Sequence, residues 1–435
     1  MPEPRFGGML GDPDTRDVDQ KAYCVHFNKH PFHTFNDKYQ KLKTERFAQE
    51  FEQLSIDMMT HFHEKMQPPE EFRRKMEWCR RLKTSIQKHN AKWLFDVVPT
   101  GSSVNGLATA DSDLDVAIHI PHAMGVLSSY SQNQDAEKRK IELEILQIVR
   151  RILQNDKEIC DEIEGDIQLV MAQIQILKIV TTEGIECDVS VVLLPFLSSL
   201  HNSFLIRHFV HIDSRFAPLC AIVKEWAAST KVKNPKDGGF NSYALVLLVI
   251  HFLQSGTNPP ILPHLQQVYK GENFVALDEH NFPKRLDFGA PLPWPLPEIT
   301  RNSQSVAVLF FEFVHYYLSF DFARHFISMR NARIMSRKET AESRVRNEEN
   351  KCVYIEDPFD AHNPGRTVRG DGFLNIRCVL SDTLNLFIPT HDDNPGDFKF
   401  PTLDDIINMM STKEPEHQED EEEEENVENE EEEVE

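Results

Sequence analysis

The sequence lacks the cysteine patterns of a zinc-binding or disulfide-stabilised protein. Its 435 residues include seven cysteines, an odd number, and no two of them form a CxxC pair. This spacing argues against a zinc module and against a disulfide framework, and it favours free thiols in a reducing compartment. Stability must therefore come from hydrophobic cores, and the chain is long enough to build two or three.

Long hydrophobic runs are also missing. The longest apolar stretch, residues 244–253, is about half the length needed to cross a bilayer, so a buried helix is the better interpretation. The first twenty residues include acidic side chains and no apolar core typical of a secretory or mitochondrial leader. We expect an intracellular protein without membrane contact, in the cytoplasm, with the nucleus as the alternative.

Basic residues are outnumbered. Lys and Arg total 47 against 70 Asp and Glu, which gives a formal net charge of −23. Fifteen of the acids fall within residues 414–435, which contain no Lys or Arg, and without them the net charge is about −8. Such a tail repels itself and cannot bury a core, so we expect it to be disordered. The mildly acidic remainder argues against a tight, purely electrostatic nucleic-acid binder but leaves room for a local basic groove.

Periodicity divides the chain into a mixed α/β part followed by a mostly helical part. Short β-branched runs bounded by turn residues predict strands at 93–99, 114–121 and 184–195, whereas residues 166–180 fit either a helix or strands. The expected fold class is α+β (mixed α/β) with a small mixed sheet. The expected divisions are a disordered N-terminus (1–35), a helix that packs on the helical domain (36–67), a mixed α/β domain (68–200), a mostly helical domain (201–405) and the disordered acidic tail (406–435).

The segment 99–120 places a Gly-Ser turn about a dozen residues ahead of two closely spaced aspartates. On a strand, residues i and i+2 point the same way, so Asp113 and Asp115 would project side by side. Two adjacent carboxylates repel each other unless a cation lies between them, and a hard divalent ion such as Mg²⁺ prefers oxygen ligands. Asp111 would point to the same strand face as Asp113 and Asp115. Alternation alone therefore does not decide which two of these three aspartates form the pair.

A third carboxylate would complete a two-metal site. Asp188 lies in an apolar predicted strand, where an unpaired acid would be costly, and is the candidate. The turn at Gly101 and Ser102 offers backbone N–H groups and a hydroxyl to a phosphate. This combination suits nucleotidyl transfer, in which one metal activates a hydroxyl and the other stabilises the leaving pyrophosphate. The alternatives are chance DxD spacing and an Asp188 paired with a buried Lys or Arg.

Longer segments extend this pattern into a resemblance. GS followed by DLDV and a later strand-borne Asp resembles the DNA polymerase β-like nucleotidyltransferases. Further segments resemble the motifs of the non-conventional poly(A) polymerases and terminal uridylyltransferases and follow one another in the right order. They are APLCAIVKEWAAS, GGFNSYALVLLVIHFLQ, NPPILPHL, SVAVLFFEFVHYYLSFDF and YIEDPFDAHNPGRTV. The resemblance covers roughly residues 99–380. It implies a bilobed molecule with a polymerase β-like nucleotidyltransferase domain and a mostly helical, poly(A)-polymerase-associated central domain.

The resemblance implies roles for matching residues. Asp113, Asp115 and Asp188 would be catalytic and would hold Mg²⁺, with Mn²⁺ as the alternative. The implied nucleotide-binding residues are Gly101, Ser102, Lys224 and Ser242 for the triphosphate, Asn202 for the ribose, Tyr243 for stacking on the base, and Asp357 and His362 in the recognition motif. A second family Lys, four residues after Lys224, is Ala228 here, so one phosphate contact is missing or comes from elsewhere.

His362 bears on the choice of base. In the uridylyltransferases that this chain resembles, a His in this segment reads the uracil edge and crowds out adenine. Against that, DPFDAHN has the shorter length of the adenylating form, and His362 could simply cap the turn at 363–365. Asp357 and Asp360 could position the His and fix its tautomer.

We therefore predict a terminal uridylyltransferase that adds UMP from UTP to RNA 3′-hydroxyls without a template, in RNA turnover or processing. The first alternative is a cytoplasmic-type poly(A) polymerase, followed by a catalytically dead RNA-binding scaffold and a small-molecule or 2′–5′ oligoadenylate nucleotidyltransferase. No RRM signature, zinc pattern or Arg-Gly repeat is present, so we expect a monomer whose RNA choice is weak or assisted by protein adaptors. Candidate RNA-path clusters are residues 73–75, 80–81 and 330–338, with solvated faces as the alternative.

Overall fold

The computed structural model describes residues 47–120, 134–171, 174–193, 198–265, 302–342, 351–359, 362–388 and 398–409. The predicted N-terminal segment 1–35 and all but the first four residues of the predicted tail lie outside these ranges, as does Asp360. Within the described part of the chain, no helix is both long enough and apolar enough to span a bilayer.

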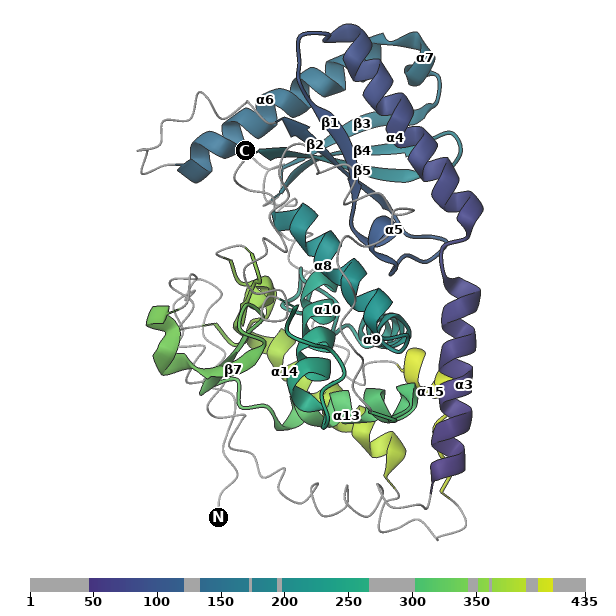
Figure 1. The fold of residues 1–435 in the computed structure, drawn as a ribbon, viewed down its shortest axis with the longest axis vertical. Helices are drawn as coiled ribbons and strands as arrows, with labels where there is room; N and C mark the ends of the chain where they lie inside the picture. Colours follow the sequence, from purple (N-terminus) through teal and green to yellow (C-terminus); the bar gives the residue numbers. More distant parts are fainter. Residues whose placement is uncertain are drawn as a thin grey trace, which may run out of the picture.

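Two long helices begin the described chain and belong to different lobes (Figure 1). Helix α3 (Ala48–Lys65) lies along the helical lobe, and Phe51, Leu54 and Met58 are buried on one side of it. Their three- and four-residue spacing is the expected amphipathic pattern. Helix α4 (Pro69–His89) starts with Pro at its first position, where the missing N–H costs nothing, and covers the sheet of the other lobe.

The first lobe is built on a five-stranded mixed sheet. Its strands are β1 (Asp96–Thr100), β2 (Leu114–Ile120), β3 (Ile163–Met171), β4 (Gln175–Thr181) and β5 (Glu186–Leu193), in the order β1-β2-β5-β4-β3. Only the pair β2 and β5 is parallel among these neighbours. The segment whose periodicity fitted either structure forms β3 and β4, and alternate residues of β4 are buried, as a strand with one covered face requires.

The two faces of this sheet have different partners. Helices α4, α6 (Gln134–Asn155) and the short α7 (Lys157–Cys160) pack on one face, where Val97, Val116, Leu177 and Val189 join a closed apolar core. On the other face, Val98 of β1, Ala117 of β2 and Val192 of β5 contribute to the core of the helical lobe. Helix α8 (Ser198–Ile212) packs on β1, and no residue of the outer strands β4 and β3 belongs to this second core.

The second lobe is mostly helical. Its elements are α8 (Ser198–Ile212), α9 (Phe216–Ser229), α10 (Ser242–His251), the π-helical turn η2 (Phe252–Gly256), α13 (Val306–Ser319), β6 (His325–Ser328), β7 (Arg333–Ser336), η3 (Arg337–Glu342), β8 (Ile355–Glu356), η4 (Pro364–Thr367), α14 (Gly370–Phe387) and α15 (Leu403–Ile407). The aromatic run in α13 packs into the core of this lobe, where Phe310, Phe313 and Tyr317 are buried. Trp226 is also in this core, and its Nε1–H donates to Oγ1 of Thr383 at 2.9 Å.

Helix α8 joins the lobes. It lies between the sheet above and the helical bundle below in Figure 1 and packs against the four-residue helix α5 (Ser102–Asn105) and the end of β1. The predicted α+β, polymerase β-like bilobed fold is confirmed. The catalytic-site candidates lie where α8 meets the sheet.

Candidate active site

Adjacent strands bring the predicted carboxylates together. Asp115 on β2 is the direct register partner of Asp188 on the parallel strand β5. Paired residues point to the same face, so these two carboxylates lie side by side. Asp113 stands just before β2, which begins at Leu114, so it reaches the site from the preceding loop and not from the strand itself.

Mutual repulsion and burial act on these acids. Burial, followed by the neighbouring charges of Asp188 and Asp113, raises the pKa of Asp115 to about 6. Burial also raises the pKa of Asp188, with the positive charge of Lys178 acting in the opposite direction. Within the described residues, Oδ1 of Asp188 is buried and accepts no hydrogen bond. A buried carboxylate oxygen without a donor, beside two further carboxylates, is suited to a hard divalent cation.

The side chains are not already arranged as a closed metal cage. Among the residues that the structure describes, no group of three or more His, Cys, Asp or Glu side chains is spaced to hold an ion. The donor chemistry of the three carboxylates fits Mg²⁺ or Mn²⁺.

Gly101 lies against the side chain of Asp115. Its φ is +67°, in the left-handed region, and a Cβ there would overlap Oδ2 of Asp115. Only glycine therefore fits between the end of β1 and the carboxylate. The backbone N–H of Gly101 donates to Oγ of Ser203 at 3.0 Å, so α8 holds this turn in place. Ser102 follows as the first residue of α5.

Lys75 is part of the support of this site. Its side chain is 1% exposed, and Nζ donates to the Ser112 carbonyl at 2.6 Å and to Oε1 of Gln67 at 2.9 Å. It also lies 3.5 Å from Oγ of Ser103, which donates to the carbonyl of Asp113. The assignment of Lys75 to a surface RNA path is therefore wrong, because this ammonium is enclosed behind the loop that carries Asp113.

The helical lobe contributes a second group of predicted residues. Lys224 lies on α9, and burial lowers its pKa, while Asp111 of the carboxylate loop is among the charges that act on it. Ser242 is exposed at the start of α10. Tyr243 is half-buried against the core, and its hydroxyl donates to Oδ2 of Asp357 at 2.8 Å. Lys224 and the carboxylate loop thus face each other across the junction of the lobes.

The recognition segment is organised by Asp357. This carboxyl is 2% exposed and accepts hydrogen bonds from the Tyr243 hydroxyl and, at 2.8 Å, from the Phe359 backbone N–H. Nε2 of His362 lies 4.0 Å from Oδ2 of the same Asp. Asp357 therefore connects the residue predicted to stack on the base with the residue predicted to read it.

Helix α8 contacts this segment through His201. The ring of His201, which the motifs do not single out, lies 5.2 Å from the ring of Phe359, and burial lowers the pKa of His201 to about 4. Within the described chain, Nε2 of His201 and Oδ1 of Asn202 are buried without a hydrogen-bond partner. Consecutive residues 201–203 thus link the recognition segment to the Gly101 turn. Only the contact with Phe359 reveals His201, because one His beside an Asn carries no sequence signal of its own.

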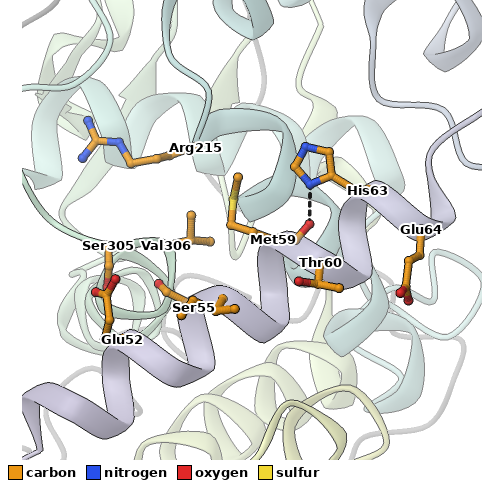
Figure 2. Close-up of a pocket in the computed structure, with 10 residues that line it drawn as sticks. Glu52, Ser55, Met59, Thr60, His63, Glu64, Arg215, Ser305 and Val306 are labelled. Atoms are coloured by element: carbon orange, nitrogen blue, oxygen red, sulfur yellow. Dashed lines mark hydrogen bonds between the residues drawn. The ribbon is translucent and has the colours of Figure 1, made fainter.

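A cavity of about 610 Å³ lies elsewhere, between α3 and the residues where α9 and α13 begin (Figure 2). Two of its lining residues, His63 and Arg215, already have partners in the protein. Nδ1 of His63 donates to the Met59 carbonyl at 2.6 Å, and Arg215 pairs with Asp213 at 2.7 Å. None of the predicted catalytic or nucleotide-binding residues lines it, so it is separate from the carboxylate site.

Two family models match the chain. The central palm domain of the mitochondrial-like poly(A) RNA polymerases matches residues 54–211, and the domain of the Cid1 family poly(A) polymerases matches residues 305–363. The first covers the sheet with the three carboxylates and reaches into α8. The second covers α13 and the recognition segment up to Asn363.

Curated relatives include poly(A) RNA polymerases. Human poly(A) RNA polymerase GLD2 is 31% identical over 303 residues, which are 68% of this chain and 56% of the relative. The gld-2 homolog A of Drosophila melanogaster is 28% identical over 335 residues, 75% of this chain and 22% of the relative. The chain thus spans about half the length of the human relative.

Solved structures share the fold. The GLD-2/RNP-8 complex has a TM-score of 0.63 at 24% identity and covers 83% of this chain and 99% of that one. The Cid1 poly(U) polymerase bound to MgGTP has a TM-score of 0.58 at 23% identity and covers 79% and 97%. Motifs, family models, curated relatives and fold agree: this chain belongs to the non-conventional poly(A) polymerases and terminal uridylyltransferases of the DNA polymerase β-like nucleotidyltransferases.

Proposed function

We propose that this chain is a template-independent RNA nucleotidyltransferase that adds nucleotides to RNA 3′-hydroxyls. The observation that carries the proposal is the register of β2 and β5, which sets Asp115 beside Asp188 next to the Gly101 turn. Together with Asp113, in the loop just before β2, they form a group of three acidic side chains whose charges act on one another. Such an arrangement serves phosphoryl-type transfer, where catalysis is mostly positioning and charge stabilisation.

Asp113, Asp115 and Asp188 would hold Mg²⁺, or Mn²⁺ as the alternative. The bound metal would supply charge neutralisation at the reacting phosphate and lower the pKa of the attacking hydroxyl. The residues of the chain do the positioning. Ser203 and the small size of Gly101 keep the turn close to Asp115. On the helical lobe, Lys224 and Ser242 would bind the triphosphate, and Asn202 the ribose.

ATP is the better-supported nucleotide. The curated relatives named above are poly(A) RNA polymerases, and the shorter DPFDAHN segment has the adenylating length. The first preference drawn from the motifs, UTP, rests on His362, which lies near Asp357 and so beside the hydroxyl of Tyr243. A structural neighbour supports that second candidate: a His-to-Asn variant of the Cid1 poly(U) polymerase, in a study of UTP selectivity, was solved with MgATP.

Single-nucleotide extension separates these activities. Purified protein is incubated with a short labelled RNA, Mg²⁺ and each NTP in turn. We expect extension with ATP above the other nucleotides, and preferred extension with UTP would select the uridylyltransferase instead. Asp113→Ala is the control, and it should abolish extension while circular dichroism shows an intact fold. Full activity in that variant would remove the metal-site assignment.

RNA selection and location complete the proposal. The sequence contains no RRM signature, zinc pattern or Arg-Gly repeat, and the structural neighbour GLD-2 was solved in complex with RNP-8. We therefore assign acceptor choice to protein adaptors. We further propose a monomeric catalytic unit in the cytoplasm. Co-purification from cytoplasmic and nuclear fractions, followed by size-exclusion chromatography, tests both points.

A further inference from the structure

Five polar or charged residues follow one another across the sheet in direct register. They form a row from β1 to β3 that consists of Thr100, Asp115, Asp188, Lys178 and Gln168. Neighbours in register point to the same face, so all five side chains belong to the face that carries the site. The two catalytic candidates occupy the middle of this row, and Lys178 is the next residue beyond Asp188.

The two ends of the row differ in their surroundings. Gly101 follows Thr100, so the end on β1 is the side of the proposed triphosphate contacts. α8 packs on that side, and Val98 and Ala117 join the helical core there. At the other end, no described helix covers the face of β4 and β3 that carries Lys178. The opposite face of β4 is closed, because Leu177 and Ile179 are fully buried beneath α4 and α6.

The open part of this face is a ledge beside Asp188, which we define by Gln168, Val170, Ile176, Lys178 and Val180. Gln168 is exposed and the other four are half-buried. Val170 pairs with Ile176 and therefore lies next to it on the ledge. Aliphatic side chains flanking a lysine provide a surface for a ribose or base and a cation for a phosphate.

Lys178 is already in an ion pair, and its partner is acidic. Its Nζ lies 2.9 Å from Oε2 of Glu186, and the two side chains are 37% and 50% exposed. Glu186 is two residues before Asp188 on β5 and pairs in register with Val180. A solvent-accessible ion pair of this kind is weak and can be exchanged for a stronger phosphate contact.

We propose that this ledge is the subsite for the 3′-terminal nucleotides of the acceptor RNA. Lys178 binds the terminal phosphodiester, and Glu186 competes with that phosphodiester for Lys178. This inference rests on the proposed function. In-line displacement requires the attacking hydroxyl to approach opposite the leaving pyrophosphate. With the triphosphate at the Gly101 end of the row, the acceptor must arrive from the Asp188 end, where Lys178 is the first cation. Its positive charge is also felt by Asp188 and Asp113, so it stands close to the reacting centre.

Opposite substitutions in the ion pair test the subsite. Lys178→Gln should raise the KM for RNA about tenfold, the equivalent of about 1.4 kcal/mol for a charge-assisted contact, with the KM for the nucleotide unchanged. It should also reduce the slope of log KM against log salt by about 0.7, the value for one phosphate of a single strand. Glu186→Gln should lower the KM for RNA about two- to fivefold, because it frees Lys178.

Lys83→Gln is the matched control. Lys83, like Lys178, is a partly exposed lysine in an ion pair, with Oδ1 of Asp96 at 2.7 Å, but it lies on α4 across the sheet. If Lys178→Gln affects the KM and the salt slope no more than Lys83→Gln does, the subsite is wrong and the pair is an ordinary surface contact.

Fluorescence anisotropy of labelled RNA gives a readout independent of catalysis. One outcome is that RNA binding weakens in Lys178→Gln but not in Lys83→Gln, while the wild-type protein fails to extend RNA with any of the four nucleotides. This result would support the ledge as an RNA-binding site and would overturn the proposed function. The opposite outcome is that the wild-type protein extends RNA, while Lys178→Gln and Lys83→Gln show equal RNA binding and equal kinetics. This result would support the proposed function and would overturn the ledge as the acceptor subsite.

Discussion

Replacing Asp115 with Asn should stabilise the metal-free protein at neutral pH while abolishing nucleotide transfer. Burial and the charges of Asp188 and Asp113 raise the pKa of Asp115 from 3.8 to about 6. In the unfolded chain the same carboxyl is in water and ionises at its ordinary pKa. The folded state therefore holds, at neutral pH, a negative charge that its surroundings disfavour.

The sign of the pH dependence follows from proton binding. The folded state binds this proton more tightly than the unfolded state, so the free energy of unfolding falls as the pH rises from about 4 to about 6. Above about pH 6 the full cost is present, and two pKa units correspond to about 3 kcal/mol. An Asn at this position has no charge to bury. Its advantage over wild type should be about 3 kcal/mol at about pH 7.5 and about 0.5 kcal/mol at about pH 4.

Urea unfolding in the presence of a chelator, at both pH values, measures this difference. Asp166→Asn, at an exposed position of the edge strand β3, is the control and should leave the stability within about 0.5 kcal/mol of wild type. Added Mg²⁺ should stabilise wild type and have less effect on Asp115→Asn, because a cation bound by the carboxylates relieves their repulsion. Equal stability of wild type and Asp115→Asn at about pH 7.5 would refute the account of buried, mutually repelling carboxylates.

Three further substitutions probe the supports of the site. Lys75→Met removes a buried donor from the Ser112 carbonyl and from Gln67, and should cost about 2–4 kcal/mol in urea unfolding; a loss below about 1 kcal/mol would contradict its structural role. Gly101→Ala would push a Cβ into Asp115 at a positive φ, and kcat should fall about 100-fold or more in extension assays, so near-normal kcat would mean the turn can shift. His362→Ala should change the ratio of kcat/KM for UTP over ATP about tenfold if the His reads the base, and an unchanged ratio would make it a turn residue.

Local patterns in the sequence determined the elements and the type of chemistry. The three- and four-residue spacing of Phe51, Leu54 and Met58 predicted α3, and all three side chains are buried. Alternation around DLDV predicted β2 and one apolar face, and Leu114 and Val116 are fully buried. These properties depend on periods of 3.6 and 2 residues, which are set within a few residues of each other along the chain.

Asp113 marks the limit of such patterns, because a strand boundary depends on hydrogen bonds to the neighbouring strand. Alternation assigned it to the same strand face as Asp115, but β2 begins one residue later. The residues 166–180 likewise carried an ambiguous pattern. They become β3 and β4 because β4 pairs with β5, and that pairing is not visible in the residues themselves.

Only the tertiary structure decided which residues share the site. Pairing of β2 with β5 sets Asp115 beside Asp188, although the described part of the chain between them contains the helices α6 and α7 and the strands β3 and β4. The enclosure of Lys75, the bond from Gly101 to Ser203, and the place of Lys178 in the row arise the same way. Each depends on strand order and on the packing of α8, which result from burying apolar surface over the whole chain rather than from any local segment.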